Sequence, residues 1–303
     1  MLRGLLRARA LLLFGTGWFP LAAAECPLPH EVASGDNVRS LADFYFGDSR
    51  YWPSIVLATN SRTADGFRFI ANWNDLGRVP KVCIPALPEA ERWRLRYEQY
   101  RAAIAETALP EPWDVVPKLV EFPEDRPLEV ATWIREDQVR AYRTTSDQWV
   151  DRAPDEIWVT VEPHLRRFCA AFLAAHNGSL EQLTLRLEQR LGLPPVSNKA
   201  RFLEIRLNRP AGDVIFRPCM DPSTKTANCP VGPPPEQVDE NHKNWIYKQY
   251  YASFGEARLS SFPWTSLGYT FDWAPDTARG RFERIGDRRQ LFDQRRDPHG
   301  VFI

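Results

Sequence analysis

The sequence contains none of the compact motifs by which catalytic folds are commonly assigned. It has no H-E-x-x-H, no C-x-x-C, no G-x-S-x-G, no phosphate-binding glycine loop and no dinucleotide-binding fingerprint. The histidines are scattered along the chain, and their spacing does not indicate a metal site. We therefore expect no metal and no cofactor, and the sequence offers no motif that assigns an enzymatic activity.

Long hydrophobic runs and an excess of charge are also missing. Beyond residue 24, no stretch approaches the run of about 20 apolar residues that a transmembrane helix needs. The formal net charge of the 303 residues is zero, and removing residues 1–24, with three arginines and no acid, leaves three negative units. This balance excludes wholesale nucleic-acid binding. The arginine-rich stretch 279–296 reads as a solvated terminus, with contact to an anionic polymer or lipid as the alternative.

Residues 1–24 have the pattern of an export signal rather than of a folded element. A basic start with three arginines precedes a short apolar stretch, and the alanines at 22–24 supply small residues for cleavage. Glu25 stands where lipid attachment to Cys26 would require a small residue. We therefore expect a soluble exported protein that is periplasmic or secreted after signal cleavage, without a transmembrane segment.

The stretch from residue 28 to residue 85 predicts a small βααβ unit directly after this signal. Residues 30–33 are extended in character and end in the turn signal Ser-Gly-Asp. Apolar residues then recur at helical spacing over residues 38–46, and Trp52-Pro53 opens a second short helix that ends at Asn60. Residues 81–85 predict a closing strand.

This series of anchors resembles the lysin motif (LysM), a sugar-binding module of cell-wall proteins. In chain order, the anchors are a Gly-Asp pair followed by spaced hydrophobic residues and an alanine, then a tryptophan, then the tripeptide Ala-x-Asn, and finally the dipeptide Ile-Pro. All of them lie within residues 26–87. The resemblance implies a shallow groove in which backbone groups bind the N-acetyl groups of glucosamine-type glycans and apolar side chains cover the sugar faces. It assigns one wall of the groove to Gly35, Asp36, Asn37 and Val38. It assigns the other wall to Asn60 and Ile70.

The chain departs from the lysin pattern in two places. Asn37 stands where the family usually has a small hydroxyl residue, and the stretch 60–82 is longer than the usual second loop. This insertion carries three aromatic residues and three arginines: Phe67, Phe69, Trp73, Arg62, Arg68 and Arg78. It is consistent with an enlarged groove that offers stacking surface, or with a loop that closes the groove and leaves a structural or protein-docking module.

Five cysteines in an exported protein favour pairing. Cys26 and Cys83 bracket the module, and a bridge between them would contribute about 4 kcal/mol on the chain-entropy estimate. Cys219 and Cys229 flank a polar, proline-containing loop, where a bridge would contribute about 3 kcal/mol. Cys169 is then left over, and its helical, apolar neighbours indicate a small buried side chain.

The remainder of the chain predicts a helix, a linker and a second domain. Residues 89–106 have a strong helix-forming composition, and five prolines over residues 109–127 predict an extended linker that contains the domain boundary. We therefore divide the chain into an export signal (1–24), a LysM-like module (26–87), a helix and linker (88–127) and an α+β domain (128–303). In this last domain we expect strands at 129–134, 157–161 and 202–207, and helices at 163–175, 179–191 and 241–254.

The fold class is therefore α+β, and the function that this organisation favours is non-catalytic binding of peptidoglycan or a chitin-like glycan. One alternative is a cell-wall hydrolase, whose acid–base groups would be the carboxylates of Asp221, Asp239 and Glu240 with His242. Another is a docking scaffold for an envelope protein. A thiol nucleophile at Cys169 is disfavoured, because His164 lies five residues away and does not share its helix face.

Overall fold

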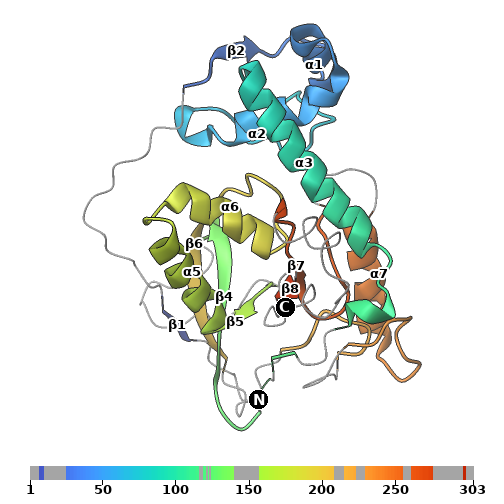
Figure 1. Cartoon of the computed structure of the whole chain (residues 1–303). Helices are drawn as coiled ribbons and strands as arrows, with labels where there is room; N and C mark the ends of the chain where they lie inside the picture. The colour runs from blue at the N-terminus through green and yellow to red at the C-terminus, as the bar shows by residue number, and fades with distance from the viewer. Residues whose placement is uncertain are drawn as a thin grey trace, which may run out of the picture.

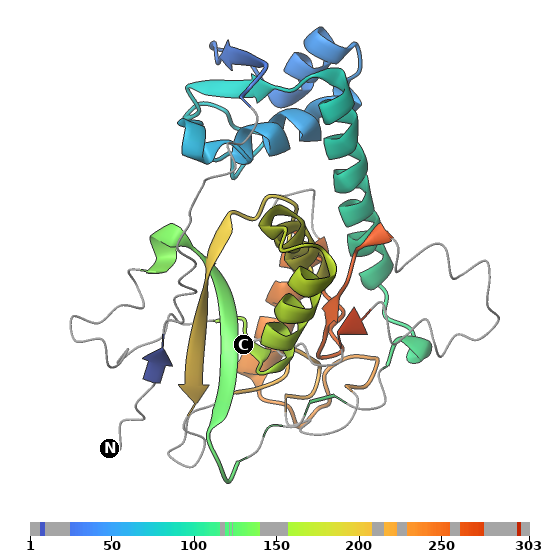
Figure 2. The same ribbon diagram turned by 60° about the vertical axis from the view of Figure 1, so that its left-hand side comes forward.

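The computed structural model describes residues 7–9, 25–115, 119–120, 122, 124–139, 157–207, 215–222, 229–254, 261–275 and 296–297. Within them the chain is an α+β protein, as expected, with a small N-terminal module and a larger body that are joined by one long helix (Figures 1 and 2). Apart from the backbone of Arg7–Arg9, the expected export signal lies outside the described residues. The arginine-rich stretch 279–296 does so too, except for Arg296.

The N-terminal module has the βααβ order that the sequence predicts. Strands β2 and β3 form an antiparallel pair in which Leu28 lies opposite Ile84 and Glu31 lies opposite Lys81. Short 3-10 turns precede and follow the second helix. The elements are β2 (Leu28–Glu31), α1 (Val38–Phe46), η1 (Ser49–Tyr51), α2 (Trp52–Asn60), η2 (Thr63–Asp65) and β3 (Lys81–Ile84).

Helix α1 begins and ends where local chemistry requires. The side-chain oxygen of Asn37 accepts hydrogen bonds from the amides of Arg39 and Ser40 at 3.1 and 3.0 Å, so it caps the first turn. Gly47 adopts a left-handed φ of 71° and closes the last turn with a hydrogen bond from its amide to the carbonyl of Asp43. These caps explain why so short a helix is well defined.

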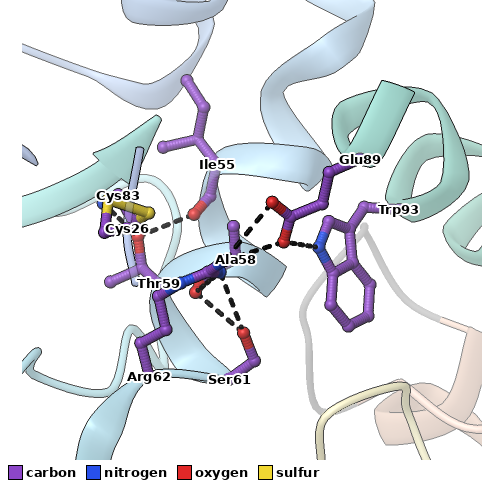
Figure 3. Close-up of a disulfide and its surroundings, with 9 residues drawn as sticks. All are labelled: Cys26, Ile55, Ala58, Thr59, Ser61, Arg62, Cys83, Glu89 and Trp93. Atoms are coloured by element: carbon purple, nitrogen blue, oxygen red, sulfur yellow. Dashed lines mark hydrogen bonds and ion pairs between the residues drawn. A yellow bond between two sulfur atoms is a disulfide. The ribbon is translucent and has the colours of Figure 1, made fainter. Parts of the chain in front are cut away.

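Helix α2 is the centre of the module, because all nine of its residues are buried. Its polar side chains therefore form hydrogen bonds with other groups inside the protein. The hydroxyl of Thr59 donates to the carbonyl of Ile55 and accepts from the amide of Cys83, beside the disulfide (Figure 3). The hydroxyl of Ser54 donates to the carbonyl of Ala90 at 2.5 Å. Buried polar groups of this kind must be paired, which fixes the helix against its neighbours.

Helix α3 (Leu87–Thr107) covers the outer side of α2 and also enters the body. Near its start, Glu89 accepts hydrogen bonds from the buried guanidinium of Arg62 at 3.0 Å and from the indole of Trp93 at 3.1 Å (Figure 3). Near its end, Tyr100 and Ile104 pack in a cluster with residues of the C-terminal part of the chain. At 1.5 Å per residue the helix is about 30 Å long. One helix therefore serves two hydrophobic cores.

The stretch after α3, predicted as an extended linker, packs onto the body where it is described. Leu119 and Phe122 are 1% and 8% exposed and belong to core clusters of the body. A single 3-10 turn, η3 (Pro112–Asp114), begins with a proline, which the first turn of a helix tolerates. Prolines keep this stretch from forming a long helix, but they do not keep its apolar side chains out of the core.

The body is built on an antiparallel sheet in the order β1-β6-β4-β5. Helices α5 and α6 cover one face, where Trp133 and Phe202 stack at 5.7 Å between ring centroids. Val130 and Ile205 belong to the core on the other face. The elements are β1 (Arg7–Arg9), β4 (Leu128–Arg135), η4 (Glu136–Gln138), β5 (Thr160–Val161), α5 (His164–Ala175), α6 (Leu180–Arg190), β6 (Lys199–Leu207), α7 (Glu240–Phe254), β7 (Thr270–Phe271) and β8 (Arg296–Asp297).

Most of the elements predicted for the body are confirmed to within a few residues, and one is shorter than predicted. The hydroxyl of Ser179 caps α6 by accepting from the amide of Gln182, as its position indicates. Of the strand predicted at 157–161, however, only Thr160–Val161 pairs with β4. Ile157 packs against the core without a place in the ladder, so its apolar character reflects burial and not pairing.

Both expected disulfides are present, and they join Cys26 to Cys83 and Cys219 to Cys229. Two disulfides fit an oxidising compartment such as an exported protein meets. Cys169 is unpaired and partly buried, and burial raises the pKa of its thiol to about 11. None of the described helices is long and apolar enough to cross a membrane.

A buried carboxylate holds a second contact between body and module. Glu188 of α6 is 4% exposed and accepts a hydrogen bond from the amide of Ser197 at 2.7 Å. The preceding residue, Val196, has a positive φ of 59° and packs against the module's core. Burial raises the pKa of Glu188 from 4.5 to about 7, although the charge of Arg96 opposes this rise. The loop is therefore held by a group that titrates near neutral pH.

Replacing this carboxylate changes how stability depends on pH. Because folding raises the pKa of Glu188, its contribution to stability is complete below pH 4.5 and declines as the pH rises toward 7. Glu188→Gln carries no charge and keeps an oxygen for the Ser197 amide. We expect this variant to lack the decline, so that its free energy of unfolding at pH 8 exceeds that of the wild type by up to about 3 kcal/mol. Urea denaturation at pH 5 and pH 8 measures this, with the exposed Glu181→Gln on the same helix as control. A parallel pH dependence in wild type and Glu188→Gln would contradict it.

The disulfide that ties the two ends of the module is expected to matter for its stability. The double variant Cys26→Ala/Cys83→Ala should lower the free energy of unfolding by about 4 kcal/mol, since the bridge closes a long loop of the unfolded chain. Urea denaturation followed by tryptophan fluorescence measures the loss, with Cys169→Ala as the matched single-thiol control. A loss below about 1 kcal/mol would show that the remaining contacts of the module hold its ends together.

Candidate functional site

The turn at residues 33–37 follows β2 and precedes α1, and a chain of hydrogen bonds holds it. One ring nitrogen of His30 lies 2.9 Å from a carboxylate oxygen of Asp36, and the other lies 2.8 Å from the hydroxyl of Tyr45. The same carboxylate oxygen accepts a hydrogen bond from the amide of Ala33 at 2.8 Å. Gly35 stands at the tip, exposed, with a φ of 96° that disfavours other residues. The turn is therefore an exposed but fixed structure.

The electrostatics of the turn follow from these contacts. The hydrogen bond from His30, and then that from the amide of Ala33, lower the pKa of Asp36 below its ordinary value. The carboxylate stays ionised at neutral pH, and it accepts its hydrogen bonds from His30 and from the amide of Ala33. Asp36 thus positions the turn, because it holds the tip at Gly35 in place.

Many of the turn's backbone amides are already occupied. The amide of Asp36 donates to the carbonyl of Ala33, and that of Asn37 donates to the hydroxyl of Ser40. The amides of Arg39 and Ser40 are capped by the Asn37 side chain. The expectation of a row of accessible amides is therefore met only in part. A ligand on this wall would meet the exposed residues Ser34 and Gly35 first.

Asn60 and Ile70, expected on the second wall, form an internal clamp. The side chain of Asn60 accepts from the amide of Ile70 at 2.7 Å and donates to its carbonyl at 3.1 Å. Both residues are buried, at 2% and 1% exposure, and Val38 of the first wall is buried at 1%. Side-chain contact between a glycan and these three residues is thereby excluded in this arrangement. Their part is to attach the insertion and α1 to the core.

The insertion at residues 60–82 folds onto the module. Phe67 is buried beside Ala58 and Cys83, while Phe69 is 36% exposed. Trp73 stacks on Trp52 with 4.5 Å between ring centroids. The sequence had indicated these aromatic residues only as a group, and the structure divides them between core and surface.

Arg39, in the first turn of α1, contacts an aromatic residue of the insertion. Its guanidinium carbon lies 5.2 Å from the ring centroid of Trp73 and 5.8 Å from that of Trp52. Sequence reasoning missed this residue, although a cation in the first turn of a helix is a signal that could have drawn attention to it. We call the exposed turn residues together with Arg39 and Trp73 the turn–insertion face.

Of the three acids considered for catalysis in the body, Asp239 and Glu240 serve the start of α7. Asp239 accepts from the amide of Asn241 at 2.8 Å, and Glu240 pairs with Lys243 at 2.7 Å. A ring nitrogen of His242 lies 2.9 Å from the carbonyl oxygen of Cys219. These contacts point the two carboxylates at their own helix. Within the part of the chain that the structure describes, no three His, Cys, Asp or Glu side chains gather in a way that could hold a metal ion.

The tryptophans of the body divide by burial. Trp133, Trp264 and Trp273 lie in the core. Trp158 and Trp245 are partly exposed and stack with 6.0 Å between ring centroids.

Comparison of the chain with protein families, with curated proteins and with solved structures found no match. The functional argument therefore rests on the geometry of the chain itself.

Removing the Asp36 carboxylate should loosen the turn. We expect Asp36→Ala to speed hydrogen exchange at the Ala33 amide, because that amide loses its acceptor, whereas Asp36→Asn keeps an oxygen and most of the protection. In the wild type the stabilisation is present above pH 3.8 and is lost as the pH falls through the lowered pKa. Exchange measured by NMR at pH 5 tests the variants. Equal exchange in Asp36→Ala and wild type would mean that other contacts hold the turn.

Proposed function

We propose that this protein binds N-acetylglucosamine-type glycan of the cell wall, without catalysis, at the turn–insertion face of its N-terminal module. The observation that carries the proposal is the fixed, exposed turn at Gly35, which Arg39 connects to an aromatic residue of the insertion. The βααβ order of the module and its resemblance to the lysin motif support the same reading.

The chemistry of the face suits a sugar. Gly35 lets a ligand approach the backbone closely, since it has no side chain to keep the ligand away. Trp73, partly buried on Trp52, offers an aromatic surface of the kind that packs on the apolar faces of sugar rings. The hydrogen bonds of His30 fix the turn before the ligand arrives, and a preorganised site loses less entropy on binding.

The setting of the module fits an envelope function. The two disulfides, together with the predicted export signal, support a location in the periplasm or outside the cell. Helix α3 then presents the body at a set distance from the wall. An envelope protein could bind to the body there. The proposal assigns no catalytic activity to the body.

A matched pair of glycine substitutions tests the face. Gly35→Ala and Gly66→Ala each place a methyl group at a positive φ where it meets no other protein atom within 4 Å. Both carry the same backbone strain, of about 1 kcal/mol, but only Gly35 lies on the face. In co-sedimentation with insoluble peptidoglycan and with chitin, we expect Gly35→Ala to weaken binding roughly tenfold and Gly66→Ala to bind like the wild type.

The aromatic contribution is tested in the same assay with Trp73→Ala. The exposed Tyr251→Ala on α7 of the body is its control. Circular dichroism confirms that each variant is folded. Absence of sedimentation by the wild-type protein, or equal sedimentation by Gly35→Ala and Gly66→Ala, would overturn the assignment. Release of soluble sugar from the wall by the wild type would instead favour the hydrolase.

A further inference from the structure

The turn–insertion face contains a cation whose contacts among the described residues are with aromatic rings and not with a carboxylate. Arg39 is exposed in the first turn of α1, and this turn contains no acid to offset it. The positive end of the helix dipole lies there too, so a cation at this position is unfavourable for the helix. Among the described residues no carboxylate forms an ion pair with Arg39, and this includes Asp43, one turn further along α1. Its placement thus works against the stability of α1.

A second cation and a hydroxyl without partners lie on α3, next to the same aromatic stack. Tyr97 packs edge-on against Trp52 with 5.2 Å between ring centroids, and Arg101 follows one helical turn later on the same side. The hydroxyl of Tyr97 and one terminal nitrogen of Arg101 are buried, and neither has a hydrogen-bond partner among the described residues. Buried donors without an acceptor are rare and costly in folded proteins.

These three groups belong to one electrostatic neighbourhood. Burial raises the pKa of Tyr97, whereas the charges of Arg101 and Arg39 both act to lower it. The geometry links them through Trp52, because the guanidinium carbon of Arg39 lies 5.8 Å and the ring centroid of Tyr97 lies 5.2 Å from the centroid of its ring. The three side chains bring two positive charges and several hydrogen-bond donors together, and none of them carries a negative charge. The partner that this neighbourhood lacks is an anion with oxygen acceptors.

We propose that Arg39, Tyr97 and Arg101 form an anion subsite beside the sugar-binding face, and that the ligand is an acidic N-acetylated glycan. The subsite takes a carboxylate, because a planar carboxylate matches the paired donors of a guanidinium. This inference rests on the proposed glycan function and deepens it. It selects a wall glycan whose units or attached peptides bear carboxylates over uncharged chitin.

The test compares oligosaccharides that differ only in charge. Isothermal titration calorimetry uses a neutral N-acetylglucosamine hexamer and a hexamer in which alternate units carry a lactyl carboxylate, with and without attached peptide. We expect the acidic hexamer to bind roughly tenfold more tightly than the neutral one. The difference should shrink when salt is raised from about 50 to 500 mM, because salt screens exposed charges. A preference that appears only with the peptide attached supports the subsite and places the carboxylate on the peptide.

Substitutions then assign the preference to the named residues. Arg39→Gln should remove the preference for the acidic hexamer over the neutral one, and Arg101→Gln should reduce that preference. Arg50→Gln is the control, since Arg50 is exposed on the same module and already paired with Asp48. Arg39 is exposed, so its variant folds and decides the question even if Arg101→Gln does not fold.

The outcomes separate the two proposals. Equal binding of both hexamers by the wild type, or an unchanged preference in Arg39→Gln, would overturn the anion subsite and leave the glycan function standing. Failure of every hexamer to bind would overturn the glycan function, and the subsite with it.

Discussion

The packing of α3 on α2 is the contact on which the rest of the structure depends. A nine-residue helix that is buried on every side is not stable with one side in water, and α3 supplies the missing cover. The carbonyl of Ala90 and the carboxylate of Glu89 receive the polar groups that α2 and its C-terminal turn bury. Because the same helix continues into the body through Tyr100, the module and the body share one rigid element.

The rigidity of α3 has a consequence for the proposed function. A module that holds wall glycan would hold the body at a fixed distance and orientation, since the connection is a helix and not a flexible tether. The loop with Val196 makes a second contact between the two parts, and Glu188 holds that loop. The orientation of the body is therefore tied to a buried carboxylate whose pKa lies near neutral pH.

The turn–insertion face combines a fixed scaffold with unmatched charge. His30 and Asp36 satisfy each other and the turn, so the scaffold is electrostatically complete. Arg39 and Arg101 have no such partners among the described residues. In a folded protein, charged groups without an opposite charge beside them are expected where a ligand supplies that charge. This contrast is why the two proposals are located on the same face.

The sequence by itself determined the local elements of this protein. Helical periodicity, the cap at Ser179, the turn at Gly35 and the two cysteine pairs depend on residues close in the chain or on simple bracketing, and the structure contains each of them. Tertiary structure alone decided that Asn60 and Ile70 clamp each other, that α3 belongs to both parts, and that Arg39 meets Trp73. These depend on which distant segments come to share a surface, and chain periodicity carries no information about that.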